Sequence, residues 1–249
     1  MKASSGFSDA ADSPCESLPW DSEFFHMRIA RLSGRRLTEN SLSAAFDWCR
    51  AERTECLYFL ASPDDPLTLS LAEREGFHLV DVRVTLSRAL PDEISPSPSV
   101  RTLQSGDLPA LLEIASVSHT ASRFYFDGRF PRDRCGELYR EWLRKSGGPP
   151  PKVTLVVEHQ GAPAGYVTYD CTDGAGEIGL LAVAAWARGN GLGWLLVQAA
   201  LAHLQKNGAK KVSVVTQGRN LGALRLYERH GFTTQSLELW YHRWFPRNG

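Results

Sequence analysis

Apolar and polar positions alternate along the chain in a pattern that predicts strands and helices in succession from residue 56 onward. Short apolar, β-branched stretches bounded by turn residues are typical of strands, and apolar residues three or four positions apart are typical of helices. Strands are expected at 56–61, 77–86, 99–103, 152–158, 164–169, 177–183, 211–216 and 234–244. Helices are expected at 66–75, 107–117, 132–145, 195–204 and 220–230, with an aromatic, basic loop at 119–131. Asp107 is expected to cap the helix that runs to residue 117. This order predicts an α/β (α+β) fold, a mixed sheet flanked by helices.

Two polar segments divide the chain. Residues 1–17 are rich in Ser, Ala and Asp and lack the apolar run of a signal peptide, which predicts a disordered tail. Residues 90–98 contain three prolines, which predicts a linker. The expected parts are therefore an N-terminal segment at 18–89 and a C-terminal domain at 99–245.

The N-terminal segment contains a partial repeat of the C-terminal domain. Leu71-Ala-Glu-Arg-Glu-Gly-Phe77 matches Leu226-Tyr-Glu-Arg-His-Gly-Phe232 at five of seven positions, with an offset of 155 (226 − 71). The strand before each helix aligns at the same offset, which favours an incomplete second strand–helix–strand copy over a coincidence of two common helix endings. Because the copy has no glycine-rich loop and has Ala72 where Tyr227 stands, we expect it to be catalytically empty.

Composition narrows the class of partner. The 249 residues are 43% hydrophobic, enough for a core, and 28 basic residues balance 28 acidic ones. Zero net charge argues against nucleic-acid binding and favours a small-molecule partner. The five cysteines are odd in number and lack metal-ligand spacing, which favours reduced thiols in a cytoplasmic protein without a metal. No apolar run is long enough for a membrane span.

The stretch Trp186-Ala-Arg-Gly-Asn-Gly-Leu-Gly-Trp194 lies between an expected strand and an expected helix. Its glycines permit positive φ and allow several N–H groups to point into one concavity at the positive end of the helix, which favours a diphosphate site. A P-loop would need Lys-Ser/Thr after the last glycine. A dinucleotide fold would need Gly-x-Gly-x-x-Gly and an acidic residue about 20 positions later, whereas the next acidic residue here is Glu228. A glycine-rich loop without a ligand is the alternative.

Two motifs carry a family resemblance. Arg188-x-x-Gly191-x-Gly193 resembles the Arg/Gln-x-x-Gly-x-Gly/Ala signature of the GNAT N-acetyltransferases, and Asn220-x-x-Ala-x-x-Leu-Tyr-x-x-x-Gly-Phe232 resembles a second pattern of that family. The resemblance covers residues 98–245. It implies the GNAT fold, with a mixed, mostly antiparallel sheet and a truncated GNAT-like half at the N-terminus. It also implies acetyl-CoA as the co-substrate.

The resemblance further implies roles for individual residues. Tyr227 is expected to be the general acid and Glu177 a base acting through water, with a core aromatic and a solvated glutamate as the alternatives. Asn220 is expected to contact the cofactor, to cap its helix, or both, and Arg188 either adds charge near the diphosphate or only braces the loop. Backbone groups expected to bind acetyl-CoA belong to Leu181, Ala182, Val183, Arg188, Gly189, Asn190, Gly191, Leu192 and Gly193.

The loop at 119–130 is expected to bind the acceptor. Arg123 can pair with phosphate, Tyr125 can stack on a base or sugar, and Ser122 and Asp127 can bind hydroxyls. Together with Leu18-Pro-Trp-Asp-Ser-Glu-Phe-Phe25, the Ser122-Arg123-Phe124 sequence is similar to that of the bacterial dTDP-fucosamine acetyltransferases. This implies the 4-amino group of a nucleotide-linked amino-deoxysugar as the acceptor. Another small-molecule amine, a protein amine and a non-catalytic acyl-CoA-binding sensor are the alternatives.

The C-terminal end is apolar and rich in Trp between residues 237 and 245. Such an end can form an edge strand that pairs with a second subunit in a homodimer, or it can pack on the N-terminal half.

Overall fold

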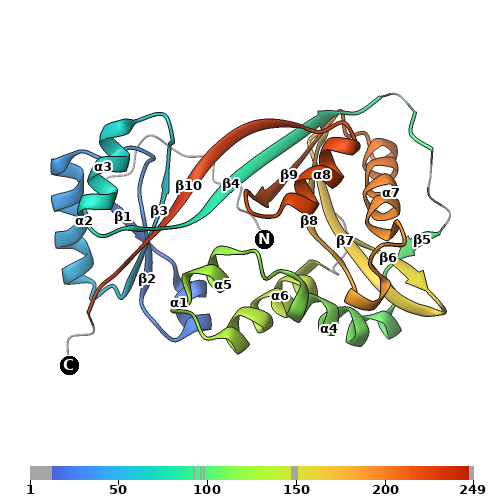
Figure 1. Ribbon diagram of the computed structural model, residues 1–249, viewed down its shortest axis with the longest axis horizontal. Coiled ribbons are helices and arrows are strands. Elements are labelled where there is room, and N and C mark those ends of the chain that lie inside the picture. The colour runs from blue at the N-terminus through green and yellow to red at the C-terminus, as the bar shows by residue number, and fades with distance from the viewer. Residues whose placement is uncertain (1–12, 92, 96, 98, 147–150, 247–249) are drawn as a thin grey trace. The chain divides into compact units, whose positions relative to one another are not determined.

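The computed structural model describes residues 13–91, 93–95, 97, 99–146 and 151–246 (Figure 1). Packing divides the chain into two compact units that do not follow chain order. The N-terminal unit contains the residues up to Arg83, Arg123–Phe130 and the residues from Leu237, and the C-terminal unit contains Val84–Ser122 and Pro131–Ser236. The strands are β1 Cys15–Ser17, β2 Ile29–Leu32, β3 Cys56–Ala61, β4 His78–Ala89, β5 Val100–Thr102, β6 Lys152–His159, β7 Ala162–Thr172, β8 Ala175–Val183, β9 Lys211–Gln217 and β10 Thr233–Trp244. The helices are α1 Pro19–Phe25, α2 Glu39–Ala51, α3 Pro66–Arg74, α4 Leu108–Ser118, α5 Arg123–Asp127, α6 Arg132–Ser146, α7 Leu192–Lys206 and α8 Leu221–Arg229.

The expected mixed α/β architecture is confirmed, and three local predictions are wrong. The last residues of the expected disordered tail form β1, which pairs antiparallel with β2 and buries Cys15, and residues 1–12 of that tail lie outside the described residues. The expected loop at 119–131 contains helix α5, whose Phe124 is buried. Asp107 does not cap α4 through its side chain, because its carboxylate accepts the Gln104 N–H at 2.8 Å and pairs with Arg101.

In the C-terminal unit the strand order is β10-β4-β9-β8-β7-β6-β5. Neighbours from β8 to β5 are antiparallel, and β8 and β9 are parallel. Helices cover both faces of this sheet. Successive residues of β7 point to opposite faces, so neighbouring positions show which helix covers each face. A side chain at Gly165 would meet Leu196 of α7, whereas the Tyr166 hydroxyl bonds to His119 at the end of α4 at 2.9 Å. The sheet of this unit is therefore the middle layer of three.

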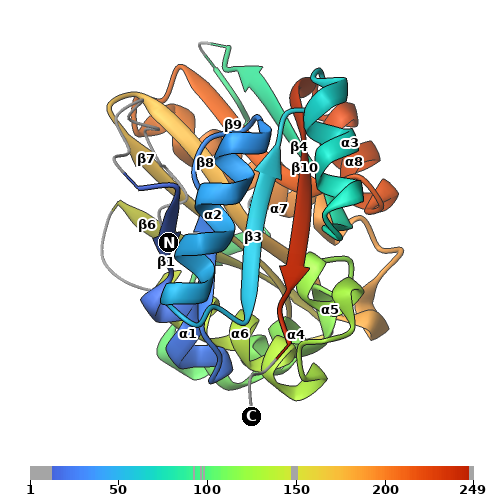
Figure 2. The ribbon, with the colours of Figure 1, turned by 90° about the vertical axis from the view of Figure 1, so that its left-hand side faces the viewer.

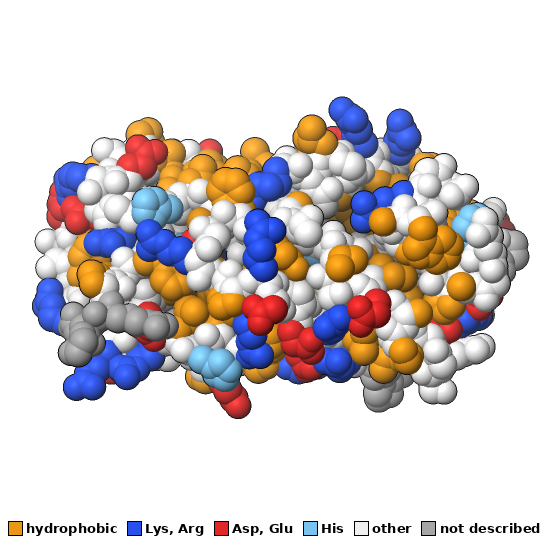
Figure 3. Space-filling model, turned by 60° about the horizontal axis from the view of Figure 1, so that its bottom comes forward, with side chains coloured by type: hydrophobic (Ala, Val, Ile, Leu, Met, Phe, Trp, Pro, Cys, Tyr) orange, Lys and Arg blue, Asp and Glu red, His pale blue; other side chains and the backbone are white. Residues whose placement is uncertain are grey.

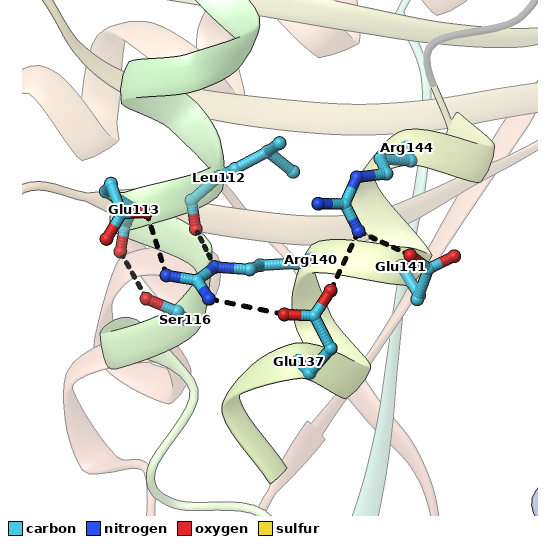
Figure 4. A network of polar contacts seen from close by, with 7 residues as sticks. All are labelled: Leu112, Glu113, Ser116, Glu137, Arg140, Glu141 and Arg144. Atoms are coloured by element: carbon cyan, nitrogen blue, oxygen red, sulfur yellow. Dashed lines mark hydrogen bonds and ion pairs between the residues drawn. The ribbon is translucent and has the colours of Figure 1, made fainter. Parts of the chain in front are cut away.

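An ion-pair network joins α4 to α6 (Figure 4). Arg140 contacts Glu113 of α4 at 2.8 Å and Glu137 of its own helix at 3.2 Å, and Arg144 contacts Glu137 at 2.8 Å. Acidic and basic side chains are interspersed on this side of the molecule (Figure 3). Exposed pairs of this kind each contribute little to stability.

In the N-terminal unit the order is β1-β2-β3-β10-β4, with β2 and β3 parallel. Helices α2 and α3 flank these strands (Figure 2). The end of β10 pairs antiparallel with β3 from Leu239↔Ala61 to Trp244↔Cys56. Of the two alternatives for the apolar C-terminal end, packing on the N-terminal half is thus observed. The core includes residues from β1, β2, β3, β10, α2 and α3, among them Leu57, Phe59 and Leu71.

The elements of the two proposed copies have matching positions. Helix α3 and strand β4 begin at residues 66 and 78, and α8 and β10 begin 155 residues later at 221 and 233 (221 − 66; 233 − 78). Helices α2 and α7 also end 155 residues apart (206 − 51). Common ancestry of the two copies stays a prediction. Within the described residues, no helix is long and apolar enough to cross a membrane.

Candidate functional site

A β-bulge bends β8 before the glycine-rich loop. Tyr169 of β7 faces Ile178, but Val167 faces Leu181, so β8 contains one extra residue over this interval. The Thr168 hydroxyl accepts the Leu180 N–H at 2.8 Å, and a Cβ at Gly179 would lie 2.7 Å from that hydroxyl. Glycine at 179 is therefore required for the close approach that holds the bulge.

Strands β8 and β9 separate beyond this bulge. Their parallel pairing runs from Ala175↔Lys211 to Ile178↔Val214, whereas β8 continues to Val183 and β9 to Gln217. A bulge bends its strand and increases the local twist, which accounts for the separation. The end of β8 thus has one side without a strand partner among the described residues (Figure 1).

The unpaired side of β8 presents two backbone amides. Ala184 donates to the Ala164 carbonyl of β7 at 2.8 Å, so antiparallel alternation directs the N–H of Ala182 to β7 as well. The same alternation directs the N–H groups of Leu181 and Val183 to the side from which β9 has separated. Of the three strand residues expected to bind acetyl-CoA, Leu181 and Val183 therefore have N–H groups without a strand partner among the described residues, and Ala182 does not.

The glycine-rich loop begins helix α7 with open N–H groups. Gly189 has φ 83° and Gly191, the N-cap residue, has φ 75°. A Cβ at either position would meet nothing within 4 Å, so the surface above the loop is open. No side chain caps α7 and no acidic residue lies in its first turn. The first N–H groups of the helix, including those of Leu192 and Gly193, therefore remain available to an anion.

Two side chains brace the loop. Arg188 Nε donates to the Val183 carbonyl at 3.3 Å, and Asn190 Nδ2 donates to the carbonyls of Ala187 at 3.1 Å and Arg188 at 3.3 Å. Arg188 is otherwise exposed. Its bracing role is thus visible in the structure, and a charge contribution to diphosphate binding stays a prediction.

Helix α8 lies against the start of α7. A Cβ at Gly193 would be 3.5 Å from Leu226, the residue before Tyr227, and Trp194 stacks on His230 with ring centroids 3.8 Å apart. Asn220 Oδ1 accepts the Ala223 N–H at 3.2 Å, so Asn220 is the N-cap of α8. This bond leaves its amide nitrogen for a ligand.

Tyr227 is buried, at 4% exposure, and its ring packs edge-on against Phe232 with centroids 5.6 Å apart. Burial raises the pKa of the Tyr227 phenol above its ordinary value. Among the described residues, its hydroxyl has no hydrogen-bond partner. A protonated phenol without a protein acceptor is free to donate to a bound group.

Glu177 lies on the part of β8 that is still paired with β9, opposite Ser213. It is exposed and precedes Leu181 by four residues, about 13 Å of extended strand. A proton released beside Leu181 would therefore reach Glu177 through water. The role of Glu177 as a base stays a prediction.

The residues expected to bind the acceptor fall in both units. Ser122, in the C-terminal unit, is 4% exposed, and its hydroxyl has no hydrogen-bond partner among the described residues. In the N-terminal unit, the Asp127 carboxylate accepts from His242 Nδ1 and, at 3.0 Å, from Trp244 Nε1. Because burial lowers the pKa of His242 to about 4, the contact is a hydrogen bond of a neutral imidazole at pH 7. These two bonds occupy Asp127 in the fold.

Arg123 is held by aromatic rings of the N-terminal unit. Its guanidinium carbon lies 4.2 Å from the Trp240 ring centroid, 4.4 Å from that of Phe124 and 5.0 Å from that of Tyr58. No carboxylate within the described residues forms an ion pair with it. Tyr125, on the same helix, is partly buried. Arg123 thus combines a fixed position with a charge that has no ion-pair partner among the described residues, and its contact with an acceptor stays a prediction.

Two residues of the site escaped the sequence analysis. Thr168 and Gly179 hold the bulge. They are eleven positions apart in the sequence (179 − 168), and their interaction depends on the register between β7 and β8. Gly179, between the apolar residues Ile178 and Leu180, is a signal for the bulge, because glycine in a strand often marks one.

Comparison with known proteins agrees with this arrangement. The model of the Acetyltransferase (GNAT) family matches residues 110–232. The chain is 30% identical to a dTDP-fucosamine acetyltransferase of Escherichia coli O6:H1 over 244 residues, covering 92% of this chain and 97% of that protein. It is 28% identical over 163 residues to the spore coat polysaccharide biosynthesis protein SpsD of Bacillus subtilis, covering 66% of this chain and 56% of SpsD. This match thus spans little more than half the length of SpsD.

Solved structures share the fold. A GCN5-related N-acetyltransferase from Sphaerobacter thermophilus superposes with a TM-score of 0.65 at 18% identity, over 92% of this chain and 76% of that one. A conserved protein of unknown function from Staphylococcus epidermidis superposes with a TM-score of 0.67 at 16% identity, over 96% and 94%. At these identities the likeness concerns the fold alone.

Proposed function

Because the chain belongs to the GNAT acetyltransferase family, we propose that it transfers the acetyl group of acetyl-CoA to the 4-amino group of a nucleotide-linked amino-deoxysugar. The observation that carries the sugar acceptor is the 30% identity to a dTDP-fucosamine acetyltransferase along nearly the full length of both chains. Zero net charge also suits a small-molecule acceptor better than a nucleic acid.

Acetyl-CoA supplies an activated thioester, and the residues of the C-terminal unit fit its parts. The open N–H groups at the start of α7 suit a diphosphate, since helix N-termini and glycine-rich loops bind such anions through backbone amides. The unpaired amides of Leu181 and Val183 suit the amide groups of the pantetheine arm and the carbonyl oxygen of the thioester. An N–H aimed at that oxygen stabilises the negative charge that develops when the amine attacks.

Proton movements are assigned to two side chains. The amine must lose a proton, which Glu177 accepts through water. The departing thiolate needs a hydrogen-bond donor, and the Tyr227 hydroxyl, which has no partner among the described residues, supplies it. Asn220 contributes its amide nitrogen to the bound pantetheine. In this proposal Arg123 and Tyr125 contact the nucleotide part of the acceptor.

A steady-state assay of thiol release tests the proposal. The full-length protein is given acetyl-CoA and either dTDP-4-amino-4,6-dideoxygalactose, the same nucleotide without the amino sugar, or a panel of other primary amines. Turnover with the amino sugar and a mass gain of one acetyl group in the product are expected. Turnover confined to other amines would keep the acetyltransferase and discard the sugar acceptor, and acetyl-CoA binding without turnover would favour a sensor.

A further inference from the structure

The N-terminal unit contains a cavity of about 710 Å³ at the C-terminal end of α2. This volume is within the range of clefts that hold small-molecule ligands. Arg28, Arg50, Arg53 and Arg243 line it, and Glu55 is the acidic residue among the described residues of the lining, whose formal charges sum to +3 (4 − 1). The cavity is therefore suited to an anion.

Two of these arginines have no neutralising partner. Arg50 pairs with Asp47 at 2.8 Å, and the Glu55 carboxylate accepts the backbone N–H of Arg28 at 2.8 Å. Within the part of the chain that the structure describes, the side chains of Arg28 and Arg53 form no ion pair or hydrogen bond. Two guanidinium groups are thus available to a ligand.

Arg243 adds a buried donor. Its NH1 group donates to the Trp244 carbonyl at 2.7 Å, but its Nε is buried and has no hydrogen-bond partner among the described residues. A buried donor without an acceptor is unfavourable. Because solvent does not reach this Nε, an anion in the cavity would meet the charge of Arg243 and not this donor.

The backbone at Arg53 has a positive φ. Five helices end in the same way, with an N–H bonded to the carbonyl five residues earlier and a residue of positive φ just before that N–H. Arg53 has φ 52° and is the counterpart of Gly208, 155 residues later (208 − 53). Glycine adopts this conformation at lower cost than any other residue. The residues of positive φ at the ends of α1, α2, α3, α7 and α8 are His26, Arg53, Gly76, Gly208 and Gly231. Arg53 thus keeps a charged side chain at a position where three of these helices have glycine.

Aromatic rings make up another part of the wall. Phe46 and Phe245 both line the cavity, with ring centroids 5.9 Å apart and planes at 84°. The Arg243 guanidinium lies 5.2 Å from the Phe245 ring centroid. Arginines beside aromatic faces bind a phosphate and a planar base together. We propose that this cavity binds a nucleoside diphosphate, either as a free nucleotide or as part of a larger molecule.

Isothermal titration with ADP tests the proposal. The titrations use the full chain with Gly191→Glu, which blocks the glycine-rich loop, so that binding reports the cavity. Sodium pyrophosphate serves as the probe without a base. dTDP serves as a nucleoside diphosphate with a different base, and CoA as a larger molecule that contains a nucleoside diphosphate. We expect ADP to bind more tightly than pyrophosphate, and its affinity to fall about tenfold in Arg53→Gly and in Arg28→Ala.

Matched variants exclude trivial explanations. Arg53→Gly removes the charge but favours the backbone conformation, so its thermal unfolding temperature should not fall. Arg132→Ala, an exposed arginine at the start of α6, removes the same charge elsewhere and should leave ADP affinity unchanged. Absence of ADP binding, equal affinity for pyrophosphate, or equal affinity in Arg53→Gly would overturn the proposal. Acetyl-CoA turnover by Arg53→Gly in the unblocked chain should be unchanged, so failure here is distinct from failure of the proposed function.

Discussion

Tyr227→Phe is the most direct test of the chemistry assigned to the C-terminal unit. The substitution removes one oxygen and keeps the ring, whose contact with Phe232 at 5.6 Å remains. Because the hydroxyl has no partner among the described residues, no intramolecular hydrogen bond is lost and the unfolding temperature should stay nearly constant. A change in rate would therefore report the bound state alone.

The size of the effect follows from the bond that is lost. A hydrogen bond to a charged group contributes about 1.5–3 kcal/mol, and about 1.4 kcal/mol corresponds to a tenfold rate change. If Tyr227 donates to the thiolate only as it departs, kcat should fall by about 10- to 150-fold while KM for acetyl-CoA changes little. Free thiol release is followed at saturating concentrations of both substrates.

The pH dependence supplies a second check on Tyr227. Burial raises the pKa of the phenol, so the proton stays on Tyr227 throughout the pH range of an ordinary assay. The ratio of wild-type to Tyr227→Phe kcat should therefore be constant from about pH 6 to pH 9. An unchanged kcat, or a loss confined to KM, would refute the assignment and leave Tyr227 a packing residue.

The other predictions concern the loop, the base and stability. Gly191→Glu should abolish acetyl-CoA binding in a calorimetric titration, because it puts a carboxylate beside the open N–H groups and strains a backbone of φ 75°; unchanged affinity would separate the loop from the cofactor. Glu177→Gln should lower kcat by less than about tenfold, since water carries the proton; a loss as large as that of Tyr227→Phe would show a direct contact. Burial lowers the pKa of His242 to about 4, below the unfolded value of about 6.5. As the pH falls, the unfolded chain therefore binds a proton at His242 before the folded chain does. The contribution of neutral His242 to the free energy of unfolding is full above pH 6.5 and is lost toward pH 4, so the melting temperature should fall less steeply over this window in His242→Gln. Parallel plots of melting temperature against pH for the two proteins would show that His242 does not cause the loss.

The sequence predicts those parts of the site that depend on local backbone requirements. Gly191 and Gly231 stand where φ is positive, and Asn220 stands where a helix needs an N-cap, so motif and geometry coincide. The bulge at Gly179 was not predicted, because it depends on Thr168 of another strand. Likewise, no local pattern joins Arg123–Phe130 to the N-terminal unit. That assignment depends on contacts with residues distant in sequence, such as those of Phe124 with Phe25 and Tyr58.

The beginnings of α2 and α7 explain why one copy of the repeated unit would hold an anion at its helix N-terminus and the other would not. Helix α2 begins at Thr38, whose hydroxyl accepts the Ser41 N–H at 3.1 Å while the Ser41 hydroxyl accepts the Thr38 N–H at 2.9 Å. Glu39 adds a negative charge in the first turn. Helix α7 begins at Gly191 without either feature. Side chains thus satisfy at α2 the same donors that α7 leaves open. If the two units share an ancestor, the N-terminal copy differs at this site in two ways, by the capping box and by the absence of a glycine-rich loop, and the opposite end of α2 has Arg53 where α7 is followed by Gly208.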